Sequence, residues 1–245
     1  MNTNKLIQNN INNLRNLFKL MGSQEQKISN NKILNLSNSW PNRLWMTYDY
    51  TNEDLQETIQ VEIQKEKSYI ISLWEHDKEI FEKSIEKLES KDYKVLFEQI
   101  GMYLELNKTE VIENDDLEII FAKKEEDILT WVKVASKAFA YEIDENIIKK
   151  IAEDKNTYLL LAYKDGIAVA STLLYENSDV MGVHLVGVPK EFRKQAIAEN
   201  IMKKAINFSK EKNIATMVLQ ASLLGLGIYK RLGFQENFIL KNYQK

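Results

Sequence analysis

The sequence predicts an α/β protein built in two parts. Short apolar runs rich in β-branched residues alternate with amphipathic segments of helical period along the whole chain. An acidic, polar break at 113–116 separates two such series. From Val180 to Phe234, a strand, a basic turn, a helix, a second strand and a second helix follow one another. We therefore expect a smaller α/β domain over 1–114 and a second domain over 115–245.

The N-terminal half opens with a helical pattern at 4–20, in which Ile7, Ile11, Leu14 and Phe18 recur on one face. The later apolar runs of this half are short and rich in the β-branched and aromatic residues that favour strands. We expect strands at 32–37, 43–48 and 68–74 and in one or two segments before residue 107, and helices near 53–64 and 76–89.

The C-terminal half has the clearer pattern. Lys164-Asp165-Gly166 lies between two apolar runs and is a tight-turn signal, so these runs are expected to form a hairpin. Acidic residues begin the first helical segment, where they suit the positive end of the helix. The predicted order is β-α-α-β-β-β-α-β-α-β, with strands at 117–122, 157–163, 167–176, 180–188, 216–221 and 238–243, and helices at 125–140, 144–153, 195–212 and 222–234.

Composition excludes several classes of protein. The 245 residues carry a formal net charge of -3 and are 44% hydrophobic, which suits a globular protein without a nucleic-acid partner. No segment approaches the roughly 18 apolar residues of a membrane helix, and the N-terminus lacks a secretory signal pattern, so we expect a cytoplasmic protein without a membrane partner. The absence of cysteine excludes disulfides and a cysteine nucleophile, and with only two histidines we expect no metal.

The start of the helix at 195–212 is a candidate anion site. Its apolar residues form one stripe, as in an ordinary amphipathic helix packed on a sheet, so only its first turn suggests a ligand. Free N–H groups at a helix start beside a strand end attract phosphate by charge and dipole together. The residues concerned are Arg193 and Lys194, followed by the N–H groups of Gln195, Ala196, Ile197 and Ala198.

These residues resemble the coenzyme A signature of the GNAT family of N-acetyltransferases. That signature is Q/R-x-x-G-x-G/A, after a strand that ends V-x-x-x-aromatic-basic. Val188, Phe192 and Arg193 match the strand exit, and Arg193, Ala196 and Ala198 occupy the motif positions. Ala196 stands where the family usually has glycine, and its Cβ would lie where the backbone approaches the diphosphate.

A second resemblance follows in the segment SLLGLGIYKRLGF, which is similar to the family motif N-x-x-A-x-x-(L/I)-Y-x-x-x-G-F. Ser222 stands at the Asn position and Gly225 at the Ala position, whereas Tyr229, Gly233 and Phe234 match directly. We expect Ser222 to cap the helix and belong to the coenzyme site, and Gly233 to end the helix in the left-handed conformation.

The resemblance covers about residues 116–245. It implies a GNAT-type fold, a mixed, mostly antiparallel sheet flanked by helices and splayed open between its fourth and fifth strands. The smaller N-terminal α/β domain lacks both motifs, and one interpretation is that it is a degenerate copy of the same fold.

The resemblance also implies roles for residues. Acetyl-CoA would be the co-substrate, with its pantetheine arm along the strand 180–188, bonded by the backbone of Leu185, Val186, Gly187 and Val188. A backbone N–H in this run would polarise the thioester oxygen. Tyr229 resembles the general acid that protonates the departing sulfur, and its structural alternative is a buried core tyrosine.

The acceptor side has two sets of candidates, each with a structural alternative. His184 sits where arylalkylamine N-acetyltransferases carry a histidine, and it is either a proton acceptor or a partly buried strand residue. Glu142, Asp144 and Glu145 lie in a region that lines the acceptor site in the family. They either hold a cationic amine or cap the helix that follows.

The function expected is transfer of an acetyl group from acetyl-CoA to a primary amine, by direct attack without an acyl-enzyme. The acceptor would be a small molecule or a peptide, and the protein a monomer or homodimer. The alternative is a non-catalytic module that senses coenzyme A or scaffolds a partner. A third possibility, an aminoacyl-tRNA donor, needs a basic face that the composition does not favour.

Overall fold

The computed structural model describes residues 3–28, 32–65, 67–111 and 117–245. The predicted break at 113–116 and the predicted boundary between 114 and 115 lie outside these residues. The chain divides into two compact units that are not continuous in sequence. We call them the first unit, which comprises Met1–Gly101, Ala221–Leu223 and Glu236–Lys245, and the second unit, which comprises Met102–Gln220 and Leu224–Gln235.

The first unit contains a sheet in the order β1-β2-β3-β4-β11-β5. Neighbours β1–β2, β2–β3 and β4–β11 are antiparallel, and β3–β4 is parallel. The strands are β1 (Ser23–Lys27), β2 (Ile33–Ser37), β3 (Arg43–Trp45), β4 (Ile70–Trp74), β5 (Lys94–Glu105, whose end enters the second unit) and β11 (Gln235–Gln244), and the helices are α1 (Thr3–Leu20), α2 (Asn52–Lys65) and α3 (Lys78–Glu89).

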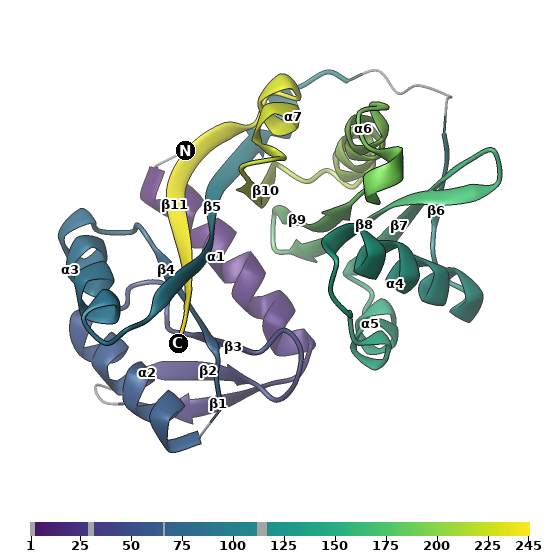
Figure 1. The fold of residues 1–245 in the computed structure, drawn as a ribbon. Coiled ribbons are helices and arrows are strands. Elements are labelled where there is room, and N and C mark those ends of the chain that lie inside the picture. Colours follow the sequence, from purple (N-terminus) through teal and green to yellow (C-terminus); the bar gives the residue numbers. More distant parts are fainter. Residues whose placement is uncertain (1–2, 29–31, 66, 112–116) are drawn as a thin grey trace. The chain divides into compact units, whose positions relative to one another are not determined.

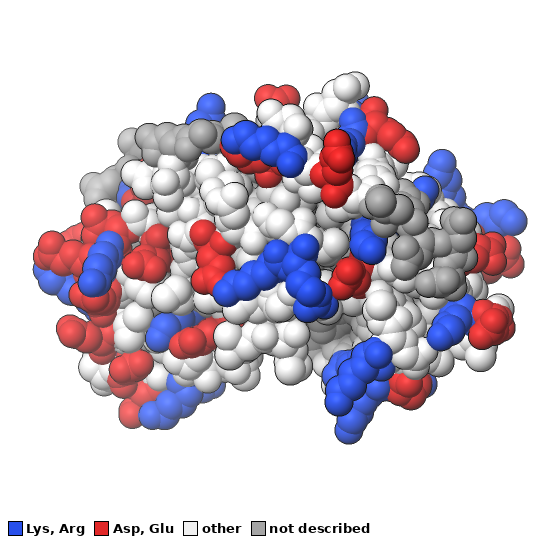
Figure 2. All heavy atoms as spheres, turned by 90° about the horizontal axis from the view of Figure 1, so that it is seen from above, with Lys and Arg blue, Asp and Glu red and all other residues white. Residues whose placement is uncertain are grey.

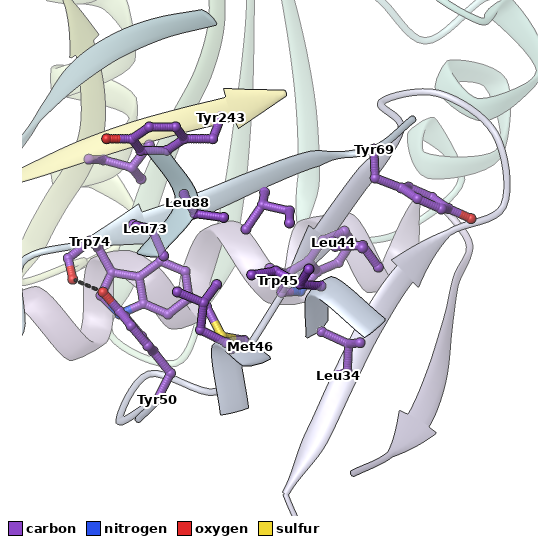
Figure 3. Packing of buried hydrophobic residues seen from close by; sticks show 14 of the residues in the cluster. Leu34, Leu44, Trp45, Met46, Tyr50, Tyr69, Leu73, Trp74, Leu88 and Tyr243 are labelled. Carbon is purple, nitrogen blue, oxygen red and sulfur yellow. Dashed lines mark hydrogen bonds between the residues drawn. The ribbon is translucent and has the colours of Figure 1, made fainter. Parts of the chain in front are cut away.

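Each face of this sheet is covered by helices. Helix α1 covers one face, where the Phe18 and Trp45 rings lie 4.9 Å apart. The opposite face carries Leu44, which is fully buried. The helices α2 and α3 contact β3 and β4, and their apolar residues belong to the same buried cluster as Leu44. Figure 3 shows part of this cluster, including the hydrogen bond of 3.3 Å that the Tyr50 hydroxyl donates to the Trp74 carbonyl.

The second unit contains a sheet in the order β10-β9-β8-β7-β6, in which only β9–β10 is parallel. The predicted element order is confirmed, and the Asp165-Gly166 turn has the expected left-handed residues, with φ of 51° and 74°. The strands are β6 (Glu118–Phe121), β7 (Thr157–Lys164), β8 (Ile167–Asn177), β9 (Val180–Gly187) and β10 (Thr216–Ser222), and the helices are α4 (Glu125–Phe139), α5 (Glu145–Ala152), α6 (Ile197–Glu211) and α7 (Leu226–Arg231).

Helices α4 and α6 flank opposite faces of this sheet (Figure 1). Tyr158 on β7 contacts Phe208 of α6, with ring centroids 4.8 Å apart. Ser171 on β8 lies opposite Leu161, three positions after Tyr158, so it points to the other face, and there it neighbours the end of α4 beside Gly187. The second unit is therefore a mixed, mostly antiparallel sheet between helices, as the sequence predicts.

Two runs of the chain repeat one order of elements. The run β1-β2-β3-α2-β4-α3-β5 has the same order as β7-β8-β9-α6-β10-α7-β11. In each run the third and fourth strands form the parallel pair. This order is what a structural duplication would produce, and the degenerate-copy interpretation remains a prediction that it supports.

Helix α2 differs from α6 at its start, although both follow the third strand of their runs. The Thr51 N–H donates to the Asp54 carboxylate at 2.7 Å, and the Asp54 N–H donates to the Thr51 hydroxyl at 3.3 Å. Through this reciprocal capping, side chains of the helix start bond its own N–H groups. Glu53 and Asp54 also make the first turn of α2 acidic. It is therefore unsuited to a phosphate group.

Strand β1 was not predicted from the sequence. Its residues, Ser-Gln-Glu-Gln-Lys, have no apolar alternation, because an edge strand exposes most of its side chains. Among the helices that the structure describes, none is both long and apolar enough to cross a lipid bilayer. Figure 2 shows basic and acidic side chains interspersed on the face it presents, in keeping with the formal net charge of -3.

Candidate functional site

The candidate site lies in the second unit where β9 and β10 part. Their parallel pairing starts at Val180 opposite Thr216 and ends at Val183 opposite Leu219. Strand β9 continues to Gly187, paired on its other side with β8. The last residues of β9 thus have no β10 partner in the recorded register, which is the splay that the resemblance implied.

A β-bulge occupies this same end of β9. Leu173 lies opposite His184, but Ser171 lies opposite Gly187, so β9 has one extra residue over this interval. Leu185 accommodates it with a left-handed φ of 52°. A bulge leaves backbone groups out of the ladder and redirects them. The bulge therefore affects the backbone of Leu185 and Val186. These residues are predicted to bond a pantetheine arm, a role that requires backbone N–H and C=O groups outside the strand ladder.

Gly187 packs against the end of α4. A Cβ added at Gly187 would lie 2.9 Å from the Ala138 Cβ and 3.1 Å from the Phe139 ring. Glycine thus lets the strand end and the helix end approach closely. The end of α4 beside this strand was not predicted from the sequence, because a small residue in an apolar helical stripe carries no local signal.

The turn before α6 has the backbone of an anion cradle. Lys194 and Ala196 adopt left-handed φ values of 63° and 56°. The Asn200 N–H donates to the Ala196 carbonyl at 3.0 Å, so the helical bonds begin only there. The N–H groups before Asn200 lie in the first turn, whose amides have no intrahelical acceptor, and Ala196 provides no side-chain cap. The residues 195–198 therefore lie at an uncapped helix start, and anion binding there remains a prediction.

Arg193 holds this turn in place. Its Nε donates to the Val188 carbonyl at 3.0 Å and its Nη2 to the Ala138 carbonyl at 2.9 Å. The side chain thus connects the exit of β9 to the end of α4. Its predicted contact with a coenzyme diphosphate remains a prediction, and the structure adds a positioning role that the sequence did not indicate.

Charged groups surround the start of α6. The Lys164 ammonium donates to the Gln195 side-chain oxygen at 2.9 Å. Glu199 in the first turn pairs with Arg231 of α7 at 3.1 Å and lies 3.8 Å from Lys203. The one acid of this turn is therefore balanced by two cations, which keeps the helix start favourable for an anion.

Tyr229 is positioned by the way α7 ends. The Gly233 N–H donates to the Lys230 carbonyl and the Phe234 N–H to the Tyr229 carbonyl, each at 3.0 Å. Gly233 has φ 92°, so these bonds form a Schellman motif, and the prediction for Gly233 is confirmed. The buried Phe234 ring then lies 5.8 Å from the Tyr229 ring and restrains it.

The Tyr229 hydroxyl is available as a proton donor. The side chain is half-buried, and the hydroxyl has no hydrogen-bond partner among the described residues. Burial raises the pKa of Tyr229, so the phenol stays protonated at neutral pH.

The expected helix cap at Ser222 was wrong. Ser222 is the last residue of β10, and α7 starts only at Leu226 with Gly225 as its N-cap residue. The strand continues further than the motif suggested, so Ser222 is too far from the first turn to cap it. Its predicted contact with the coenzyme is independent of capping and remains a prediction.

His184 lies in the interior. Its side chain is buried, and the Thr172 hydroxyl donates to its backbone carbonyl at 3.3 Å. Burial lowers the pKa of His184 to about 3, since a buried imidazolium loses its hydration. The imidazole is therefore neutral at physiological pH and a weak proton acceptor. This favours the interpretation of His184 as a structural strand residue, and its role as a catalytic proton acceptor remains a prediction.

The buried His184 predicts a pH dependence of stability. The unfolded chain titrates this group near pH 6.5 and the folded protein near 3, so the unfolded state binds more protons between these values. His184 thus makes stability fall as pH drops from 6.5 toward 3, with a slope of at most about 1.4 kcal/mol per pH unit. Chemical denaturation at several pH values should show a shallower slope for His184→Asn than for the natural protein, and identical slopes would contradict the burial.

The acidic candidates behave mainly as local structure. The Asp144 carboxylate accepts from the Asn146 N–H at 3.0 Å and the Ile147 N–H at 3.4 Å, which is N-capping of α5. Glu145 lies 3.6 Å from Lys149 within the same helix. Glu142 is exposed between α4 and α5. The capping alternative therefore holds for Asp144, and amine binding by these three residues remains a prediction.

The splayed parallel pair, the bulge and the open helix start together define the architecture of an N-acetyltransferase domain. Residues 120–239 match the family model described as an acetyltransferase (GNAT) domain. The chain therefore contains, over these residues, a domain of the GNAT family of acetyltransferases.

Solved structures share this fold over most of the chain. A GCN5-related N-acetyltransferase from Kribbella flavida is similar with a TM-score of 0.71 and 16% identity, covering 95% of this chain and 92% of its own. One from Sphaerobacter thermophilus has a TM-score of 0.65 and 14% identity, covering 87% and 76%. A glucosamine N-acetyltransferase region of a fungal multi-domain β-N-acetylglucosaminidase has a TM-score of 0.63 and 13% identity, covering 91% and 31%. Among curated proteins, no sequence relative was found.

Proposed function

We propose that this protein transfers an acetyl group from acetyl-CoA to a primary amine by direct attack. The observation that carries the proposal is the uncapped start of α6 directly after the bulged, splayed end of β9. The same two elements would supply donors for a diphosphate and for an extended acyl-bearing arm. We place this activity in the cytoplasm, in a protein that works as a monomer or homodimer.

Different residues would contact different parts of the coenzyme. The amides at 195–198, with Lys194 and Arg193 beside them, would hold the diphosphate, and Ser222 would contact the coenzyme at the end of β10. The backbone of Leu185, Val186, Gly187 and Val188 would align the arm and polarise the thioester oxygen. When bound, acetyl-CoA supplies an activated acyl carbon, so the chain needs no nucleophile of its own.

Tyr229 would complete the reaction as general acid. The amine nitrogen forms a bond to the acyl carbon while the carbon–sulfur bond breaks, and the Tyr229 hydroxyl gives its proton to the departing sulfur. The acylated nitrogen then loses a proton to solvent, and the Tyr229 phenolate takes one back from solvent, so the proton count is restored. The ammonium proton must leave before attack. Because His184 is buried and neutral, we propose that water relayed to a carboxylate accepts that proton.

A thiol-release assay tests the proposal. The full chain and acetyl-CoA are mixed with a panel of small amines, amino acids and peptides, including glucosamine because one structural neighbour is named for that acceptor. We expect thiol release that depends on one class of amine. Coenzyme binding by calorimetry with no release from any amine would instead support the sensor alternative.

Ala196, which stands where the family usually has glycine, is relevant to the sensor alternative. Its left-handed backbone predicts that glycine at this position would raise both the stability of the protein and its affinity for the coenzyme. An L-residue at φ 56° is strained, by roughly 1–2 kcal/mol in a left-handed helical conformation. Ala196→Gly should raise the free energy of unfolding by about 0.5–1 kcal/mol after the greater chain entropy of glycine is subtracted. It should also tighten coenzyme binding in calorimetry, and weaker binding would contradict the cradle.

A further inference from the structure

The first unit holds a group of unpartnered polar atoms beneath α1. The Asn35 side chain is fully buried, and neither its Nδ2 nor its Oδ1 has a hydrogen-bond partner among the described residues. The Trp45 Nε1 and the Arg15 Nε are likewise buried without a partner in the described part of the chain. Leaving such atoms unsatisfied is costly, so a natural protein usually provides something that bonds them.

The register brings these atoms to one place. Asn35 of β2 lies directly opposite Trp45 of β3 and opposite Glu25 of β1, so the three side chains share one face of the sheet. That face is covered by α1, because the Phe18 ring contacts the Trp45 ring. Arg15 lies about one turn before Phe18 on the same helix, and the negative charge of Glu25 raises its pKa.

Among the unpartnered atoms of Asn35, Trp45 and Arg15, N–H donors outnumber acceptors. The indole offers one N–H, the carboxamide two and Arg15 Nε one, against a single carboxamide oxygen. Water satisfies such a group poorly, since each water brings hydrogens that need acceptors of their own. Glu25 does not balance the surplus alone, because it is bound to Lys19 at 2.5 Å.

The charge of Arg15 is also incompletely compensated. Burial lowers the pKa of Arg15 more than the nearby Asp49 and Glu25 raise it. An arginine keeps its proton in proteins, so these two carboxylates offset the cost of burying the cation only in part. A second arginine, Arg43, lies 5.6 Å above the Phe18 ring and adds positive charge to the same face.

We propose that the first unit binds a small carboxylate beneath α1, through Asn35, Trp45 and Arg15. A carboxylate is acceptor-only and can take several N–H donors at once, and its charge complements the guanidinium. This site uses none of the residues proposed for acetyl transfer. It would give the N-terminal half a ligand of its own, distinct from a coenzyme.

The test measures thermal unfolding of the full chain with sodium acetate, glycine or L-glutamate, against sodium chloride at matched ionic strength. We expect at least one carboxylate to raise the melting temperature by about 3 °C or more at saturating concentration. Asn35→Leu should abolish that shift. Trp45→Phe keeps an aromatic ring but loses the N–H, and it should raise the dissociation constant of the carboxylate by about tenfold.

Two controls separate binding from a mere packing defect. Thr157→Val removes a buried unpartnered hydroxyl in the second unit and should leave the shift unchanged. Tyr229→Phe should also keep it, so failure of the acetyl-transfer proposal is read separately. The inference is overturned if no carboxylate gives a shift in the natural protein, or if the shift persists at full size in Asn35→Leu.

Discussion

Replacing Tyr229 by phenylalanine should lower the turnover of acetyl transfer by about 100-fold or more, the usual contribution of a positioned general acid. The departing thiolate then has to take its proton from solvent. Because phenylalanine retains the ring that contacts Phe234 at 5.8 Å, and the Schellman bonds use only the backbone, the fold should be preserved. Steady-state kinetics with the best amine, together with calorimetry for the coenzyme, measure the two effects separately.

The expected signature is a loss in kcat with coenzyme affinity within about twofold of the natural protein, because the lost interaction exists only in the transition state. Tyr158→Phe is a matched control in the same unit, since its hydroxyl bonds Glu176 at 3.2 Å on the α6 face. Its turnover should be nearly unchanged. A turnover of Tyr229→Phe within roughly threefold of the natural protein would be far smaller than the usual loss of a general acid. That result would make Tyr229 a structural tyrosine.

Gly101→Ala should be the most destabilising single-methyl change in the first unit. A Cβ at Gly101 would lie 2.0 Å from a carbon of the Phe238 ring, closer than any real contact. Phe238 is only 4% exposed and belongs to the main buried cluster, so the ring has little space into which it can move. We expect a loss of about 2–3 kcal/mol in the free energy of unfolding, measured by denaturant titration.

A double mutant isolates the cause of that loss. Phe238→Ala alone should cost about 3–5 kcal/mol by leaving a cavity. Adding Gly101→Ala to it should cost little more, because the methyl then enters the vacated space. Additive losses would show instead that Gly101 is needed for its backbone conformation and not for the ring above it.

Local pattern predicted most elements correctly. The apolar stripe at Ile7, Ile11, Leu14 and Phe18 identified α1, and the Asp165-Gly166 turn identified the β7–β8 hairpin. These features depend on side chains a few residues apart, whose periodicity is visible in the chain itself. Strand β1 escaped because its polar residues carry no such periodicity.

Local pattern did not predict partners across long separations. Strand β11 pairs with β4, with Leu240 opposite Trp74, and so belongs to the first unit although it ends the chain. The motif around Tyr229 identified the helix and its glycine end but misplaced the start, because the extension of β10 to Ser222 depends on the sheet. Arg193 matched a coenzyme motif, yet its bonds to Val188 and Ala138 depend on where α4 ends.

The motifs of the sequence indicated a GNAT-type domain by resemblance. The sequence by itself also determined the order of strands and helices and the glycine that ends α7, because these two features follow from hydrogen bonding and periodicity over a few neighbouring residues. Only the tertiary structure decided that His184 is buried and neutral, that β9 bulges at Leu185, and that Asn35 and Trp45 meet beneath α1. Desolvation and register depend on chain segments far apart in sequence, and no local pattern contains that information.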